Sequence, residues 1–207
     1  MTQRRLVLGS RSPRRAGLLA EAGFAFRQVD PPYADPADPS AHSPAFAGVE
    51  ALAEALAVRK AESLAGLLAA DEVGLTADTV CVDGRGRAIG TPESAERAEA
   101  MIRGFVNSAH RVVTGVAMAT ADGGVVERFA EAATVTLGAL DDGEIAEYVA
   151  GDGWRGKAGG YNLTERVAAG WPIEVQGDAD TVVGLPVGRL VELLERHGVA
   201  RAGRSVA

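Results

Sequence analysis

Two long strand-forming stretches in the middle of the chain restrict its fold more than any other feature. Residues 110–120 and 125–137 flank the turn residues Gly123 and Gly124, and a glycine turn between two such stretches is typical of a β-hairpin. The two strands of a hairpin pair antiparallel. Any sheet that this chain forms therefore contains an antiparallel pair.

The segments around this hairpin alternate between strand and helix patterns. Strands are expected at residues 4–9, 26–29 and 73–82, and helices at residues 13–22, 50–68, 91–103, 141–149 and 186–197. Ser12 suits the N-cap of the first helix, Pro13 its first position and Gly23 its end. Residues 30–44 predict a surface loop, residues 151–180 give no clear pattern, and the tail from residue 199 is expected to fray.

This order of elements predicts the fold class. Strands that alternate with helices are typical of α/β proteins, and the hairpin makes the sheet a mixed one. We therefore expect an α/β protein with a mixed, twisted sheet, flanking helices and two lobes around a central cleft. The length of 207 residues allows this in a single domain spanning residues 1–207.

Composition and charge argue against several classes of function. Hydrophobic residues make up 47% and charged residues 24% of the chain, as in ordinary globular proteins. The apolar stretches are too short for a membrane span, and that at residues 6–8 is too short for a signal-peptide core. The single cysteine, Cys81, excludes an intramolecular disulfide. We therefore expect a cytoplasmic protein with no membrane partner, and the net charge of −7 argues against nucleic acid.

The segment between the first strand and the first helix is the first candidate site. It reads Ser10-Arg11-Ser12-Pro13-Arg14-Arg15 and lies where free backbone N–H groups and the helix dipole favour an anion. Ser10 and Ser12 add hydroxyl donors, and Arg14 and Arg15 can bind phosphate oxygens. The alternative is a capped helix with solvated arginines. Cations at a helix N-terminus are unfavourable, however, so an anion should compensate them.

Asp78 is the second candidate, because its carboxylate interrupts an apolar strand. An ionised carboxylate in such a place is costly unless it is paired or bound to a metal. At a strand end it could instead cap a loop. The neighbouring Cys81 is better explained as a small core residue than as a nucleophile. The three histidines are far apart in sequence, so oxygen ligands and therefore Mg²⁺ or Mn²⁺ are favoured for any metal site.

Two lysines are further candidates. Lys60 lies on a predicted helix, where a lone lysine is usually solvated. Lys157 begins a glycine-rich segment, and glycines let the backbone approach a ligand closely or form a tight turn.

Several of these segments together resemble the Maf proteins, a family of nucleoside triphosphate pyrophosphatases. The matching segments, in order, are residues 10–15, 59–61, 77–80, 110–115, 157–161 and 183–186. They span most of the chain. The resemblance implies a mixed-sheet α/β fold of the Maf and inosine triphosphatase-like kind, a divalent metal (Mg²⁺ or Mn²⁺) and a homodimer.

The resemblance also implies roles for single residues. Asp78 matches the general base of the family, and Lys60 matches a lysine that contacts phosphate. Arg14 and Thr79 fall where the family discriminates substrates, and Asp35 falls where it has acidic residues near the metal. The expected site therefore has Asp78 as catalytic residue, Asp35 and Asp78 as metal ligands, and as substrate-binding residues Ser10, Ser12, Arg14, Arg15, Lys60, Thr79, Lys157 and Thr164.

Four positions depart from the family pattern. Pro36 stands where a glutamate is common, and Asn107 replaces a usual glycine. Thr91 replaces a lysine, which removes a positive charge from the phosphate site, and it is well placed to cap the helix that Pro92 opens. Thr164 replaces a glutamine or glutamate, which bears on base specificity.

The predicted function is hydrolysis of nucleoside triphosphates, with dTTP and UTP as substrates, to the monophosphate and pyrophosphate. Water attacks the α-phosphorus, and Asp78 deprotonates the water or holds the metal that activates it. Two alternatives remain open. A nucleotidyltransferase would usually have a glycine-rich loop at residues 10–13. A nucleotide-binding regulator that has lost catalysis is favoured by Thr91.

Overall fold

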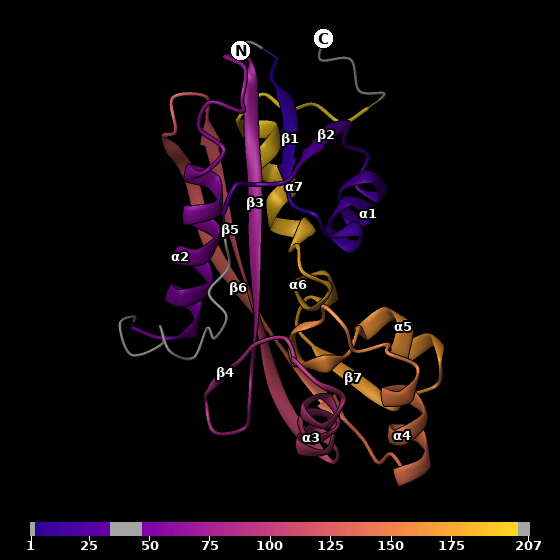
Figure 1. Ribbon diagram of the computed structural model, residues 1–207. Coiled ribbons are helices and arrows are strands. Elements are labelled where there is room, and N and C mark those ends of the chain that lie inside the picture. The colour runs from indigo at the N-terminus through magenta and orange to yellow at the C-terminus, as the bar shows by residue number, and fades with distance from the viewer. Residues whose placement is uncertain (1–2, 34–46, 203–207) are drawn as a thin grey trace.

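The computed structural model describes residues 3–33 and 47–202, and a mixed sheet forms its centre (Figure 1). The strands are β1 (Arg5–Gly9), β2 (Phe26–Val29), β3 (Glu72–Val82), β4 (Ala88–Ile89), β5 (Ser108–Thr120), β6 (Val125–Leu137) and β7 (Ile173–Gln176). The helices are α1 (Pro13–Glu21), α2 (Val49–Glu62), α3 (Ala95–Phe105), α4 (Asp142–Ala150), α5 (Leu163–Ala168), α6 (Ala179–Val183) and α7 (Val187–Arg196), with the 3-10 helix η2 (Ala158–Gly160).

The sheet has seven strands in the order β2-β1-β3-β5-β6-β7, and β4 pairs with β3. β1 is parallel to both β2 and β3, whereas the other pairs are antiparallel. The expected α/β fold with a mixed sheet is therefore confirmed. The long hairpin is confirmed as well, because β5 and β6 pair along nearly their whole length.

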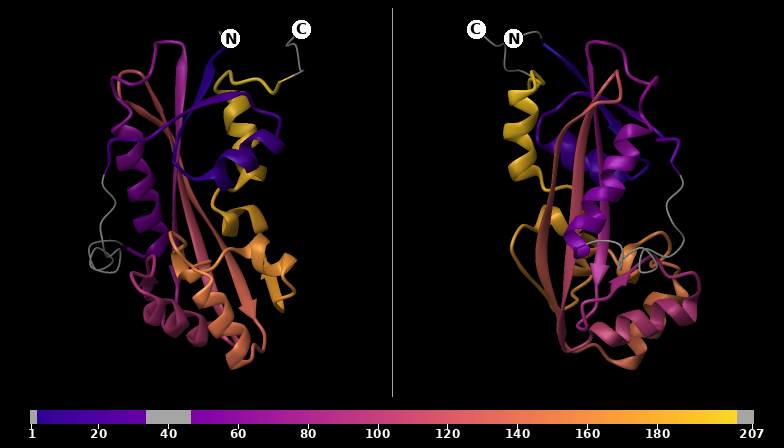
Figure 2. Two further views of the ribbon diagram at one scale, coloured as in Figure 1. Left: turned by 45° about the vertical axis from the view of Figure 1, so that its right-hand side comes forward. Right: turned by 90° about the vertical axis from the view of Figure 1, so that its left-hand side faces the viewer.

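The strands that follow β1 in the chain, β2 and β3, lie on opposite sides of it in the sheet. α1 leads from β1 to β2 on one face of the sheet, and α2 leads to β3 on the opposite face (Figures 1 and 2). The order of the strands thus reverses at β1. In open α/β sheets, ligands bind outside the carboxyl ends of the strands at such a reversal. β3 pairs with β1 only as far as Leu75 and continues beyond the end of β1 to Val82.

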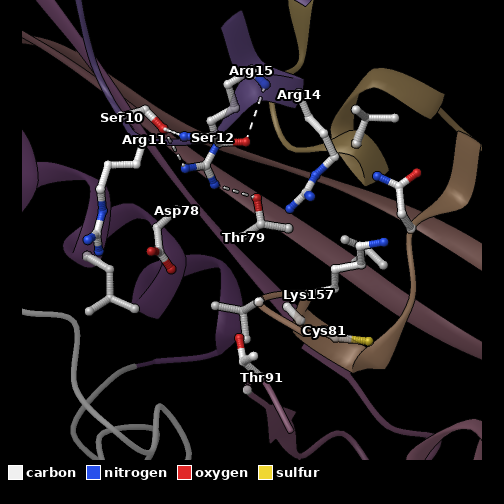
Figure 3. A pocket seen from close by; sticks show the side chains of 18 of the residues that line it. Ser10, Arg11, Ser12, Arg14, Arg15, Asp78, Thr79, Cys81, Thr91 and Lys157 are labelled. Atoms are coloured by element: carbon white, nitrogen blue, oxygen red, sulfur yellow. Dashed lines mark hydrogen bonds between the residues drawn. The ribbon is translucent and has the colours of Figure 1, made fainter. Parts of the chain in front are cut away.

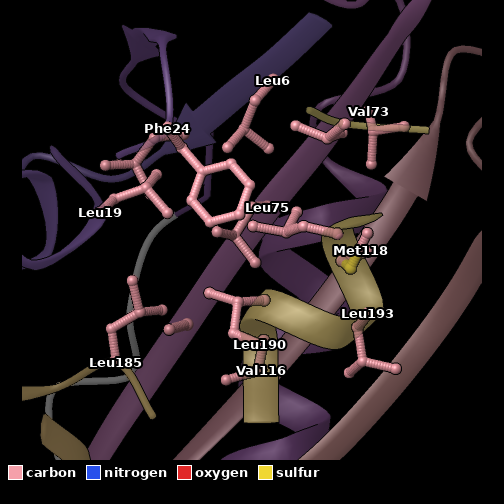
Figure 4. Packing of buried hydrophobic residues seen from close by; sticks show 14 of the residues in the cluster. Leu6, Leu19, Phe24, Val73, Leu75, Val116, Met118, Leu185, Leu190 and Leu193 are labelled. Carbon is pink, nitrogen blue, oxygen red and sulfur yellow. The ribbon is translucent and has the colours of Figure 1, made fainter. Parts of the chain in front are cut away.

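Two apolar clusters occupy one face of the sheet. The first lies under α1 and α7, where Leu19 and Leu190 pack against Leu75 and Val116 (Figure 4). The second lies under α3 and α4 and includes residues 102, 135, 137 and 145. On the other face α2 packs directly on β5: a Cβ added at Gly115 would lie 2.1 Å from the carbonyl oxygen of Ala53. This close approach accounts for the glycine in β5.

Two predicted helix boundaries were wrong. α2 ends at Glu62 and not near residue 68, although the apolar pattern continues. After Glu62 the backbone forms three-residue turns, with Leu64 N donating to Ala61 O and Ala65 N to Glu62 O, and the positive φ of 81° at Gly66 prevents the helix from continuing. α3 begins at Ala95, and Ser94 caps it by accepting a hydrogen bond from Arg97 N. Thr91 is therefore not the cap of α3.

The predicted fraying of the C-terminal tail was also wrong for its described part. Val199 is buried in the first apolar cluster. Arg201 forms a β-bridge with Phe24, and Ala202 N donates to Gly23 O at 2.7 Å. Residues 151–180, left without a pattern by the sequence, contain α5, β7 and the start of α6. Most of the loop expected at residues 30–44 lies outside the described residues.

Candidate active site

A cleft of about 620 Å³ opens beyond the carboxyl end of β1 (Figure 3). It lies where the strand order reverses, as the topology predicts. Nearly all of the expected substrate-binding and catalytic residues line it, namely Ser10, Ser12, Arg14, Arg15, Lys60, Asp78, Thr79 and Lys157. Segments far apart in the sequence thus meet at one site.

Asp78 lies in the middle of β3, in the stretch beyond its pairing with β1. Its side chain is 13% exposed and its Oδ1 lies 2.5 Å from Nζ of Lys60, which is 10% exposed and comes from α2. The ion pair balances the charge that the sequence placed in an apolar strand. The alternative in which Asp78 caps a loop at a strand end is wrong. Lys60 is likewise not a solvated surface lysine.

The loop after β1 is ordered by its own serines. Ser12 caps α1 as expected, since its Oγ accepts a hydrogen bond from the backbone N of Arg15 at 3.4 Å. Ser10 is buried, and its Oγ accepts from the backbone N of Ser12 at 3.1 Å. Both contacts arrange the first turn of α1 around the cleft.

Arg15 is tied to three separate segments. Its Nε donates to Gly184 O at 2.8 Å, its Nη1 to Ser10 Oγ at 3.4 Å and its Nη2 to Thr79 Oγ1 at 3.0 Å. The loop after β1, the strand β3 and the end of α6 are thereby joined by one guanidinium group. Its donors face protein oxygens, so Arg15 fixes the walls of the cleft in addition to supplying charge.

Arg14 and Lys157 complete the basic lining. Arg14 extends from α1 into the cleft (Figure 3), and no hydrogen bond or ion pair to its side chain is formed within the described residues. Lys157 precedes η2 and forms an ion pair with Glu165, which is half-exposed. The cleft therefore concentrates positive charge on a chain that is acidic as a whole, and a cleft focuses such a field.

The inner end of the cleft is aromatic and neutral. His110 is stacked on Phe105 with ring centroids 4.0 Å apart, and its Nε2 lies 2.8 Å from the hydroxyl of Tyr161. Burial lowers the pKa of His110 to about 4 and raises that of Tyr161, so both are uncharged at neutral pH. Burial also raises the pKa of Cys81 to about 12, which agrees with a core residue and not with a nucleophile.

The structure does not bring Thr164 into the cleft. Thr164 lies exposed in the first turn of α5, and Asn162, two residues earlier, lines the cleft in its place. Asn162 caps α5, because its Oδ1 accepts from Glu165 N at 3.0 Å. The helix start turns Thr164 outward. An asparagine three residues before a glutamate is a helix-cap signal that could have placed this boundary from the sequence.

Carboxylates near the cleft bear on metal binding. Asp30, which follows β2, also lines the cleft, and its Oδ1 lies 3.4 Å from Nε of Arg11. The sequence contained a signal for it, since parallel β1 and β2 end at the same edge of the sheet. Asp35 and Pro36 lie outside the described residues. No group of three or more His, Cys, Asp or Glu suited to a metal occurs in residues 3–33 and 47–202.

Comparisons with known proteins find one matching family model and several similar curated proteins. The family model for Maf-like proteins matches residues 5–197. A protein of Pelotomaculum thermopropionicum named dTTP/UTP pyrophosphatase is 38% identical over 193 residues, which cover 93% of this chain and 96% of the relative. A protein of the same name from Rhodospirillum rubrum is 38% identical over 202 residues, covering 96% and 90% of the two chains.

Among solved structures, a nucleoside-triphosphatase/dITP/XTP pyrophosphatase of Mycobacterium abscessus matches with a TM-score of 0.42 and 16% identity, over 93% of this chain and 95% of that one. The family model and the relatives extend over almost the entire sequence, including every segment that lines the cleft. This chain belongs to the Maf family.

Proposed function

We propose that this chain hydrolyses nucleoside triphosphates, with UTP and dTTP as its substrates, to the nucleoside monophosphate and pyrophosphate. The observation that carries the proposal is the Asp78–Lys60 pair inside a cleft whose other wall is the basic segment of residues 10–15. The choice of substrates is supported by the names of relatives at 32–38% identity.

The loop after β1 is suited to hold the triphosphate. Backbone N–H groups at the start of α1 and the positive end of its dipole favour an anion. Both lone pairs of Ser10 Oγ are occupied by donors, from Ser12 N and Arg15, so its own hydrogen is left for a phosphate oxygen. Arg14 and Lys157 add charge-assisted donors.

Asp78 is suited to act as the base. Its Oδ1 is held by Lys60, and its Oδ2 is left to accept a proton from water. In the proposed step the water oxygen bonds to the α-phosphorus, the bond from that phosphorus to the bridging oxygen breaks, and pyrophosphate leaves with the electron pair. The basic residues around the phosphates stabilise the charge that develops on them.

The donor set around the cleft fits a hard divalent cation, and we propose Mg²⁺ or Mn²⁺. Asp78 and Asp30 are the carboxylates among the described lining residues, and Asp35 is a third candidate outside them. Magnesium is often held by one or two carboxylates together with substrate phosphates. When bound, such an ion supplies Lewis-acid stabilisation of phosphate charge.

We further propose a cytoplasmic homodimer. The dimer rests on the resemblance to the family, and the cytoplasmic location on the composition and the single cysteine. No helix within the described ranges is long and apolar enough to cross a membrane. Light scattering of the purified chain should give twice the mass of one chain, and the mass of a single chain would contradict the dimer.

The proposal is tested by pyrophosphate release from UTP and dTTP by the wild-type chain and by Asp78→Asn. Loss of the base should lower kcat by about a hundredfold or more while the fold is retained. Asp71→Asn is the matched control, because it also removes a carboxylate paired with a basic residue, Arg5, but at an exposed site. Thermal melting of all three proteins separates a catalytic loss from unfolding.

The outcomes separate the proposed function from its alternatives. Tight binding of UTP by the wild type without release of pyrophosphate would indicate a nucleotide-binding regulator. Release that requires a sugar phosphate as second substrate would indicate a nucleotidyltransferase. Near-wild-type turnover by a stable Asp78→Asn would remove Asp78 from the reaction.

A further inference from the structure

Two threonine hydroxyls and a carbonyl form a hydrogen-bonded row beside the cleft. Thr79 on β3 and Thr114 on β5 lie directly opposite each other in the sheet, with their Oγ1 atoms 2.9 Å apart. Thr114 Oγ1 then donates to the backbone oxygen of Thr181 on α6 at 2.8 Å. Thr114 is fully buried and is not among the residues that line the cleft.

The direction of every hydrogen bond in this row is determined. The carbonyl of Thr181 only accepts, so the single hydrogen of the Thr114 hydroxyl points to it. Thr114 must therefore accept from Thr79, whose own hydrogen is thereby used. The oxygen of Thr79 in turn accepts from Nη2 of Arg15, because a guanidinium only donates.

The row continues through Arg15 to the anion-binding loop. Arg15 also donates to Ser10 Oγ, which leaves the Ser10 hydrogen directed to other acceptors. A buried backbone oxygen on α6 is thus connected, through alternating donors and acceptors, to a hydroxyl that faces the phosphate site. Changing one member of such a network affects the orientation of the others.

We propose that Thr114 is a positioning residue for hydrolysis. By accepting the hydrogen of Thr79 it keeps the Thr79 oxygen available to Arg15, and so it holds Arg15 and Ser10 in the orientation that receives the phosphates. This inference rests on the proposed function. It also means that Thr79 has no hydrogen to offer a phosphate oxygen while the row is intact.

The test is Thr114→Val, which keeps the shape and removes the oxygen. The Thr79 hydroxyl then has no acceptor at residue 114, so its hydrogen is free to turn toward Arg15, which needs an acceptor there. We expect kcat for UTP to fall about tenfold, with KM changed less than about threefold, because Arg15 and Ser10 act where charge develops in the transition state. Thr114→Ser restores the hydroxyl and should return kcat to within about threefold of wild type.

Thr76→Val is the matched control. Thr76 is also fully buried on β3, and its Oγ1 also donates to a backbone oxygen, that of Ala57 at 2.7 Å, but the contact is not part of the row to Arg15. The Thr76→Val substitution should lower the melting temperature as much as Thr114→Val does, and it should leave kcat within about twofold of the wild-type value. If Thr114→Val does not fold, Thr114→Ala provides the same kinetic comparison.

A double-mutant cycle identifies the route of the effect. If Thr114 acts through Thr79, adding Thr114→Val to Thr79→Val should change kcat by less than about twofold. If the two substitutions lower kcat independently, so that their effects multiply in the double variant, the positioning role is overturned. It is also overturned if Thr114→Val lowers stability but leaves kcat unchanged. An inactive wild-type chain would instead overturn the proposed function, so the two failures are distinguishable.

Discussion

At the scale of single residues, the two neighbouring arginines in the first turn of α1 have different roles. Arg15 donates to three protein oxygens from three segments, whereas Arg14 extends into the cleft without a described partner. The sequence predicted an anion site for both arginines, and the resemblance implied substrate discrimination for Arg14, but neither predicted that Arg15 would be held by protein oxygens. The difference arises from Gly184 and Thr79, which are distant in sequence and meet Arg15 only in the folded chain.

Thr91→Lys should restore the basic residue that the family commonly has here. Thr91 lines the cleft, and since Ser94 caps α3, the substitution removes no helix cap. One added charge-assisted contact to a phosphate is worth about 1 kcal/mol, so kcat/KM for UTP should rise about fivefold at unchanged melting temperature. Thr164→Lys adds the same charge outside the cleft and should leave kcat/KM unchanged. Equal kinetics in the two variants would show that the lysine at residue 91 contributes nothing.

Site residues could be predicted from the sequence where one residue contradicts its surroundings. Asp78 was recognisable as a carboxylate in an apolar strand, and residues 10–15 as a cluster of cations at a helix start. The role of Thr114 was not recognisable, because it depends on the register between β3 and β5. The pairing of Lys60 with Asp78 likewise depends on how α2 packs on the sheet.

At the scale of elements, a polar clamp connects the strands on either side of β1. Arg27 of β2 and Glu72 at the start of β3 form an ion pair with N–O distances of 2.8 and 2.6 Å, and Ala69 N also donates to Glu72. These contacts, the Arg27 hydrogen bond above all, lower the pKa of Glu72 from 4.5 to about 2. The carboxylate is thus stabilised in its charged form.

Glu72→Gln should make folding less sensitive to acid. A carboxyl group with a lowered pKa in the folded state contributes stability above pH 4.5, and this contribution is lost as the pH falls from 4.5 toward 2. The variant should therefore melt at a lower temperature than wild type at pH 7, and the difference should shrink through that range. Glu99→Gln, which removes an exposed pair with Arg103, is the control. A constant difference between pH 7 and 2 would contradict the clamp.

Elements were predicted more reliably than their ends. The strands of the hairpin follow a clear pattern, and their bounds differ from the expected ones by two residues at most. The end of α2 was missed because the apolar pattern continues beyond Glu62, where Leu64 and Leu68 pack against Val7 outside the helix. The side chains of Leu64 and Leu68 are thus buried although they follow the end of the helix.

At the scale of the whole molecule, the two ends of the described chain stabilise each other. Arg4 N donates to Gly198 O at 2.9 Å, and the segment after Gly198 pairs with the chain before β2. The sequence alone could not predict this contact, because a short terminal segment has no periodic pattern and its order depends on a distant partner. Val199 is buried by the same arrangement.

Removal of residues 199–207 should therefore destabilise the protein. Loss of one buried valine side chain removes about 1.5–3 kcal/mol, which corresponds to a fall in melting temperature of roughly 3–12 °C for a chain of this size. Removal of residues 203–207 alone is the control, and the longer truncation should melt at a lower temperature than this control. If the two truncated proteins melt together, the contacts of residues 199–202 contribute no stability.

The length of β3, β5 and β6 has a mechanical consequence. These three strands run from the cluster under α7 to the cluster under α3 and α4, and they are hydrogen bonded to one another along the way. A hinge rotation of one half of the molecule against the other would have to break hydrogen bonds between β3 and β5 and between β5 and β6 at the same time. The cleft is therefore stiff along the strands, and its freedom to admit a nucleotide and release products lies in the loops and short helices of its walls.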